Sequence, residues 1–166
     1  MINRGSKLLG ALLMAGSLLF ASPAWAPPPT KVAISNMADF LFGTWSGVGD
    51  VSLNNNVCAH RSTAGTYNVT ASGDGIGGAF TLAHTLLAGQ SLSYRVYWND
   101  QANTVGRVEL TANSALGAQA TGGANKTCQG GSSLNANLSI EIEEVNMLSV
   151  AAGSYTGILT VLIGPD

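Results

Sequence analysis

The side chains that could carry chemistry in this 166-residue chain are few, and their spacing matches no catalytic or metal-binding pattern. His60 and His84 are the two histidines, and neither has further ligand residues at the spacing that a tetrahedral metal site requires. No Gly-x-Ser-x-Gly segment, which would present a nucleophilic serine, occurs anywhere. We therefore expect both histidines at the surface or in loops, and we expect no enzyme activity, no cofactor and no metal.

Two further segments resemble chemical sites but have simpler explanations. The glycine-rich run 73–78 lacks both the following helix and the Lys-Ser/Thr pair of a phosphate-binding loop, so it predicts a turn. Glu141 and Glu143 alternate with apolar residues, and Glu144 follows them. This pattern predicts carboxylates on the solvent-exposed face of a strand rather than a calcium site.

The amino terminus has the pattern of a secretory signal peptide over residues 1–26. Arg4 and Lys7 precede an apolar stretch at 8–20, and the small residues Ala24 and Ala26 allow cleavage after either position. The stretch is shorter than the roughly 20 residues that span a bilayer, and no cysteine follows it to carry a lipid. We expect an exported mature chain that starts near residue 27 and has no transmembrane segment.

Cys58 and Cys128 are the two cysteines of the chain. In an exported protein such a pair is more often a disulfide than a metal site or a nucleophile. Closing a loop of about 70 residues would stabilise the fold by about 4 kcal/mol through the lost entropy of the unfolded chain. The sequence therefore predicts one structural disulfide.

Composition narrows the class of protein further. Charged residues make up 10% of the chain, against about 25% in a typical soluble domain, and the formal net charge is −2. Without a cluster of Lys and Arg, the electrostatic requirement of nucleic-acid binding is not met. The 46% of hydrophobic residues can form a core, which excludes general disorder despite 21 glycines.

Short runs of strict alternation between apolar and polar residues recur from residue 31 onward, and no helical period does. The clearest runs are 134–143, 92–99 and 66–71, separated by Gly-, Asn- and Ser-rich turns. Shorter candidate strands are 32–36, 39–45, 48–53, 79–82, 105–110 and 155–163. Seven to nine short strands predict an all-β fold, an immunoglobulin-like β-sandwich rather than a barrel.

The final candidate strand, 155–163, is apolar on both of its faces, which indicates a strand covered on both sides. The chain ends three residues later at Asp166, so we expect no following strand to flank it. An uncovered apolar edge would promote aggregation. Two explanations stay open: an earlier strand of the same chain covers it, or a strand from another chain is added to it.

Three segments of the chain resemble motifs of a known family. They are DFLFGTW at 39–45, LSYRVYWND at 92–100 and AGSYTGILTV at 152–161. In order and spacing they resemble the spore coat protein U-like domains, the subunits of archaic chaperone–usher fimbriae. The resemblance spans nearly the whole mature chain.

This resemblance implies an immunoglobulin-like subunit that lacks its last strand. A periplasmic chaperone would lend the strand first, and the amino-terminal extension of a neighbouring subunit would replace it at an outer-membrane usher. The chain would then pass through the periplasm to a fimbria on the cell surface. The groove that accepts the strand would be formed by Phe40, Phe42, Leu159, Val161 and Ile163.

The chain departs from the family in two ways. The family carries a cysteine in its first strand, whereas this chain has Ile34 there, which implies that Cys58 pairs with the distant Cys128. Only residues 27–30 precede Lys31, and three of them are prolines, which cannot donate ladder hydrogen bonds. Either the chain accepts a strand without giving one, or the stretch with Val32 and Ile34 is the donor.

The resulting prediction is a signal peptide at 1–26, a lead-in with the first strand at 27–38 and a sandwich domain at 39–166. The function that it implies is a secreted, non-catalytic structural subunit assembled by strand exchange. The alternative is a self-complete sandwich that binds a ligand such as a sugar. Its aromatic platform would come from Trp45, Tyr97 or Trp98, although sheet packing is the commoner role of such side chains.

Overall fold

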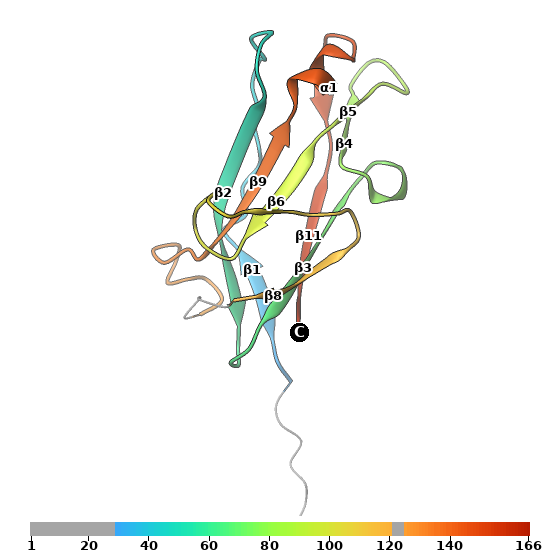
Figure 1. The fold of residues 1–166 in the computed structure, drawn as a ribbon. Coiled ribbons are helices and arrows are strands. Elements are labelled where there is room, and N and C mark those ends of the chain that lie inside the picture. The colour runs from blue at the N-terminus through green and yellow to red at the C-terminus, as the bar shows by residue number, and fades with distance from the viewer. Residues whose placement is uncertain (1–28, 121–124) are drawn as a thin grey trace, which may run out of the picture.

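A computed structural model describes residues 29–120 and 125–166 of the chain. The predicted signal peptide, residues 1–26, lies outside the described residues. Figure 1 shows two layers of antiparallel strands face to face, with β2, β9 and β6 in one layer and β3 and β11 in the other. The described residues therefore form an all-β sandwich, as the alternating pattern predicts.

The first sheet has five antiparallel strands in the order β1-β2-β9-β6-β7. Its strands are β1 (Val32–Ser35), β2 (Val51–Arg61), β9 (Ala136–Ile142), β6 (Arg95–Asn99) and β7 (Val108–Glu109). β9 lies at the centre, between β2 and β6, so its register fixes the sheet: Leu138 lies opposite Asn55 on one side and Trp98 on the other.

The second layer consists of two smaller antiparallel sheets. One has the order β11-β3-β8, with β11 (Leu159–Pro165), β3 (Tyr67–Gly73) and β8 (Ala115–Gln119). The other has the order β10-β4-β5, with β10 (Tyr155–Thr156), β4 (Thr81–His84) and β5 (Ser91–Ser93). A one-turn helix, α1 (Glu144–Leu148), follows β9, and the glycine-rich run forms the predicted turn around a 3₁₀ segment, η1 (Ile76–Gly78).

The strand order corresponds to that of an immunoglobulin-like sandwich. In their order across the sheet, β1, β2, β9 and β6 take the places of strands A, B, E and D, while β3 and β11 take those of C and F. An immunoglobulin domain has a seventh strand beside F. No strand among the described residues takes that place, so one edge of β11 has no ladder partner.

The core lies between the two layers and is built from the inward residues of the predicted alternation. Trp98, Tyr67 and Leu138 are its largest fully buried side chains, and the rings of Tyr67 and Trp98 meet edge to face at 6.3 Å. The outward face of β9 is less exposed than the sequence predicts. Asn137 and Ser139 are fully buried there, because Asn137 donates to Asn54 and the hydroxyl of Ser139 donates to Asn137.

The predicted strand at 39–45 does not form. Residues 36–50 contain no strand, and the chain leaves β1 through Asn36, whose φ of 62° is left-handed and cannot continue an extended strand. Further along, Gly47 (φ 93°) and Gly49 (φ 80°) turn the chain back into β2. The predicted strand at 155–163 is likewise divided, into β10 and β11.

Candidate functional site

An apolar groove runs along the sandwich between two stretches of chain that have no ladder with each other. Its two adjoining cavities, of about 490 and 750 Å³, share residues of both stretches. We call residues 37–45 the first wall and residues 150–159 the second wall. The residues that line both cavities are Phe40, Leu41, Phe42, Leu82, Thr156 and Gly157.

The floor of the groove is the core itself. Leu138 and Ile140 line the first cavity and Ile142 lines the second, so three successive inward positions of β9 are open to the groove. At about 3.4 Å per residue they extend over roughly 14 Å. Tyr94 adds an aromatic ring to the floor, and burial, helped by the nearby Asp74 carboxylate, raises the pKa of its hydroxyl to about 12.

The first wall is held in place by few contacts. Phe40 and Phe42 are half-buried and pack against the core, while no backbone group of residues 36–50 bonds to another backbone group within the described chain. The amide of Asn55 donates to the carbonyl of Ala38 at 2.9 Å. The inward-facing Asn55 thus holds the first wall beside β2, where a β-ladder would otherwise be expected.

The second wall is held through His84, which closes β4. His84 is 8% exposed, and its Nδ1 accepts hydrogen bonds at 3.0 Å from the backbone N–H groups of Leu86 and Leu87. Nε2 lies 3.4 Å from the carbonyl of Ala152, and the ring packs edge-on against Tyr155 at 4.9 Å. The prediction of a surface or loop histidine is therefore wrong for His84, because the second wall covers it. His60 lies half-buried on β2.

The groove is open at one end and closed at the other. Cα atoms of β1 and β11 come within 8 Å of one another without forming a ladder. A strand between them would need roughly 9–10 Å, twice the spacing of paired strands. The structure thus leaves room for a further strand beside the two walls but not beside the part of β11 after Leu159, which lines neither cavity.

Of the five predicted groove residues, three line the part of the groove that has room for a strand, and two lie beside its closed part. Phe40, Phe42 and Leu159 line the open part. Val161 and Ile163 pack against the core further along β11, which approaches β1 within 8 Å.

The predicted donor residues Val32 and Ile34 lie in β1, which pairs with β2 in the chain's own first sheet. Both side chains pack against the core of the same domain. The backbones of Lys31 and Ser62 continue this ladder by one hydrogen bond of 2.8 Å, and the hydroxyl of Ser35 donates to the carbonyl of Lys126 at 2.8 Å. β1 is therefore fixed at both of its ends.

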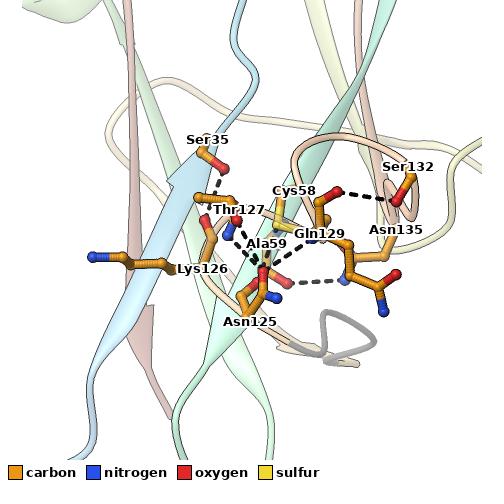
Figure 2. The surroundings of a disulfide bond; sticks show 10 residues. Ser35, Cys58, Ala59, Asn125, Lys126, Thr127, Gln129, Ser132 and Asn135 are labelled. Carbon is orange, nitrogen blue, oxygen red and sulfur yellow. Dashed lines mark hydrogen bonds between the residues drawn. A yellow bond between two sulfur atoms is a disulfide. The ribbon is translucent and has the colours of Figure 1, made fainter.

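Cys58 and Cys128 form the predicted disulfide, with their Cα atoms 5.7 Å apart (Figure 2). The bond joins β2 to the loop that precedes β9. Close by, the side-chain amide of Asn135 accepts from the N–H of Ala59 and donates to its carbonyl, both at 2.9 Å. Disulfide and amide together hold this loop against the sheet.

The other candidate residues lie away from the groove or in the core. Arg107 pairs with Glu141 and lies 4.0 Å above the ring of Tyr97, so one face of this ring is covered. Trp98 is fully buried and cannot present a platform to a sugar. Trp45 does line the groove, and its N–H donates to the carbonyl of Gly49 at 2.9 Å.

Neither a metal site nor a membrane-spanning helix is found in the part of the chain that the structure describes. Residues 29–120 and 125–166 hold no group of three or more His, Cys, Asp or Glu residues that could hold a metal ion. No helix within the same ranges is long and apolar enough to cross a membrane.

Sequence reasoning missed three features of the site: Asn55, His84 and the floor formed by β9. Asn55 lies between Leu53 and Val57 at a position of β2 where the alternation calls for an apolar residue. This mismatch is a signal from which a special role of Asn55 could have been predicted. His84 carries no comparable signal, because its partners are backbone groups.

Comparison with known proteins shows the fold and nothing finer. No family model and no curated protein matches the chain. A solved structure described as "Chaperone-tip adhesin complex is vital for synergistic activation of CFA/I fimbriae biogenesis" contains a chain that is similar in fold, with a TM-score of 0.53 and 15% identity. The match covers 82% of this chain and 42% of that chain.

Proposed function

We propose that this chain is a non-catalytic structural subunit of a surface fibre and is joined to a neighbour by accepting a β-strand into its groove. The observation that carries the proposal is the pair of unpaired backbone edges on either side of an apolar floor. β11 offers one edge at its start, beside Leu159, and the first wall, which makes no backbone–backbone hydrogen bond within the described chain, offers the other. Edge strands with free N–H and C=O groups are templates for pairing with another chain.

A strand added from another chain would pair with the backbone edges and cover the apolar floor at the same time. The backbone of the added strand would pair with the edges, and every second side chain would cover Leu138, Ile140 and Ile142 on the floor. Removing apolar surface from water contributes about 25 cal/mol per Å², so covering the half-buried wall residues Phe40, Phe42 and Leu159 favours binding. A small polar ligand would leave both backbone edges and most of this floor uncovered.

The proposal that a chaperone and an usher assemble this subunit rests on its resemblance to spore coat protein U-like subunits of chaperone–usher fimbriae. On this proposal a periplasmic chaperone supplies the first strand, an outer-membrane usher the place of exchange and a neighbouring subunit the final strand. The disulfide fits passage through an oxidising compartment. The fold that this chain shares with a chain of a fimbrial chaperone–adhesin complex also supports the proposal.

The test is heat-sensitive polymerisation on the surface of the native host. Material sheared from cells that produce the full chain is separated in SDS with and without heating, and detected with an antibody. We expect a ladder without heating and one band after heating, because strand-exchanged subunits resist SDS until they unfold. A single band in both lanes would contradict the proposal.

Two variants connect the ladder to the groove. Phe40→Asp places a charge on the first wall and should abolish the ladder. Ile76→Asp changes a fully exposed residue of η1 and should leave it intact. A ladder that is unchanged in Phe40→Asp would place the assembly contact elsewhere.

A further inference from the structure

The rim of the groove carries exposed apolar side chains on the outer surface of the sandwich, on both walls. Leu41 is 85% exposed and lies on the first wall between the inward-facing Phe40 and Phe42. Ile158 is 68% exposed and lies on the second wall, directly before β11. Both residues line the first cavity, so they flank the same opening.

These apolar residues are confined to the edge of the layer. The neighbouring strand β3 presents Asn68, Thr70 and Ser72 to the outside, as expected for the solvated face of a sheet. Exposed apolar residues that gather beside an unpaired edge mark an interaction site more strongly than scattered ones. Leu41 and Ile158 therefore flank the place where a further strand would be added, and Leu162 on β11 is the exposed apolar residue beyond it.

A strand that enters the groove has two faces. Its inward side chains meet the floor, and its outward side chains become cross-strand neighbours of Leu41 on one side and Ile158 on the other. Polar outward side chains would leave these two residues in contact with water and a polar neighbour. Apolar ones would cover both residues.

We propose that the strand accepted by this groove is apolar on both of its faces where it passes between Leu41 and Ile158. This inference rests on the proposed function and adds the chemistry of the partner. Leu41 and Ile158 then distinguish among strands that cover the floor equally well, which makes them specificity-determining residues.

Charge supports the same partner. Asp39 is the charged residue among those lining the two cavities, and neither cavity is lined by Lys or Arg. An acidic side chain on the incoming strand would therefore meet a like charge and no compensating cation. The partner segment is uncharged over the floor and has a basic residue, if any, at the end near Asp39.

The probes are two synthetic nine-residue peptides with acetylated and amidated ends, a lysine at each terminus and valine at the inward positions. One has threonine at its three outward positions and the other has leucine there. Binding to the purified mature chain is measured by the change in tryptophan fluorescence, to which Trp45 in the groove contributes beside the buried Trp98. Sedimentation confirms that both peptides are monomeric at the concentrations used.

We expect the leucine peptide to bind more tightly by about two- to fivefold for each apolar pair that it forms. Leu41→Ser and Ile158→Ser should each reduce this advantage. Leu162→Ser is the matched control, because Leu162 is 63% exposed on the outer face of β11 but lies beside the closed part of the groove. It should leave the advantage unchanged.

The outcomes separate this inference from the proposed function. Equal binding of the two peptides, or an equal loss in Leu162→Ser and Ile158→Ser, overturns the inference and leaves strand acceptance standing. Failure of both peptides to bind contradicts strand acceptance itself, and the inference with it. A leucine advantage that is lost only in the two rim variants supports both.

Discussion

His84 holds the second wall of the groove through both ring nitrogens. Nδ1 accepts from two backbone N–H groups and Nε2 faces the carbonyl of Ala152, so one neutral tautomer with its proton on Nε2 satisfies all three groups. Gly153 packs against the ring so closely that a Cβ there would lie 2.2 Å from Nε2. Ring and glycine together define the course of the chain at 150–155.

His84→Ala should lower the free energy of unfolding by about 1–3 kcal/mol, because the substitution removes the acceptor of two backbone N–H groups and the ring that packs against Tyr155. His84→Asn should recover part of this loss, since its amide oxygen can stand where Nδ1 accepts. Urea unfolding measures both values, with the exposed Thr85→Ala as the control. A loss that is equal in the Ala and Asn variants would show that packing against Tyr155, and not the hydrogen bonds, holds the wall.

Two core tyrosines make the fold sensitive to alkaline pH. Burial raises the pKa of Tyr67 to about 12, and burial and Asp74 raise that of Tyr94 to about 12, from 10 in the unfolded chain. The folded state therefore favours the neutral phenol. This stabilisation is complete below pH 10 and is lost as the pH rises from 10 towards 12.

We expect the free energy of unfolding to fall over this range by up to about 1.4 kcal/mol per pH unit for each of Tyr67 and Tyr94. Tyr67→Phe should make the fall less steep and should cost little at pH 7, because no hydrogen bond of normal geometry reaches the buried Tyr67 hydroxyl in the described structure. Brief urea titrations at pH 9, 10 and 11 measure the slope. A slope that is identical in the variant would rule out Tyr67 as its source.

At the scale of elements, periodicity predicts the strands whose partners lie on both sides. The runs at 134–143 and 66–71 form β9 and β3, since each fills one face with core residues such as Leu138 and Val69. The run at 39–45 is apolar at three successive positions, 40–42, and forms no strand. Its inward residues Phe40 and Phe42 still face the core, but the structure contains no ladder partner for its backbone.

The remaining differences depend on partners that a local pattern does not reveal. β8 was not predicted, because Leu116 alone among its residues packs against the core. Asn137 is buried through amides of β2, more than 80 residues away in the chain. The apolar residues of the candidate groove could be predicted from the sequence. The closed end of the groove and the hydrogen bond from Asn55 to the first wall could not, because both depend on how distant elements lie beside one another.

The disulfide should contribute strongly to stability because it joins elements that are distant in the chain. Cys58 and Cys128 are 70 positions apart, and the chain-entropy estimate for such a loop is about 4 kcal/mol. Cys58→Ser combined with Cys128→Ser should lower the melting temperature under oxidising conditions and match the native chain in reductant. Equal melting of both proteins in both conditions would show that the bond adds nothing.

At the scale of the whole molecule, the position of β1 decides whether the chain can give a strand as well as accept one. β1 pairs with β2 over four residues and lies close to β11 where the groove is closed. Donation of Val32 and Ile34 to a neighbour would break this ladder, expose the core of the chain's own domain and release Ser35 from Lys126. We therefore expect β1 to remain in its own domain during assembly.

A disulfide between β1 and β2 tests this expectation. Ala33 and His60 are register partners, so Ala33→Cys with His60→Cys can lock the two strands together, and mass spectrometry confirms that the native Cys58–Cys128 bond has formed as well. The locked chain should give the same heat-sensitive ladder as the single-cysteine controls, because its groove is unchanged. Loss of the ladder that reductant restores would instead mean that β1 leaves its domain, and Val32 and Ile34 would then be the donor residues.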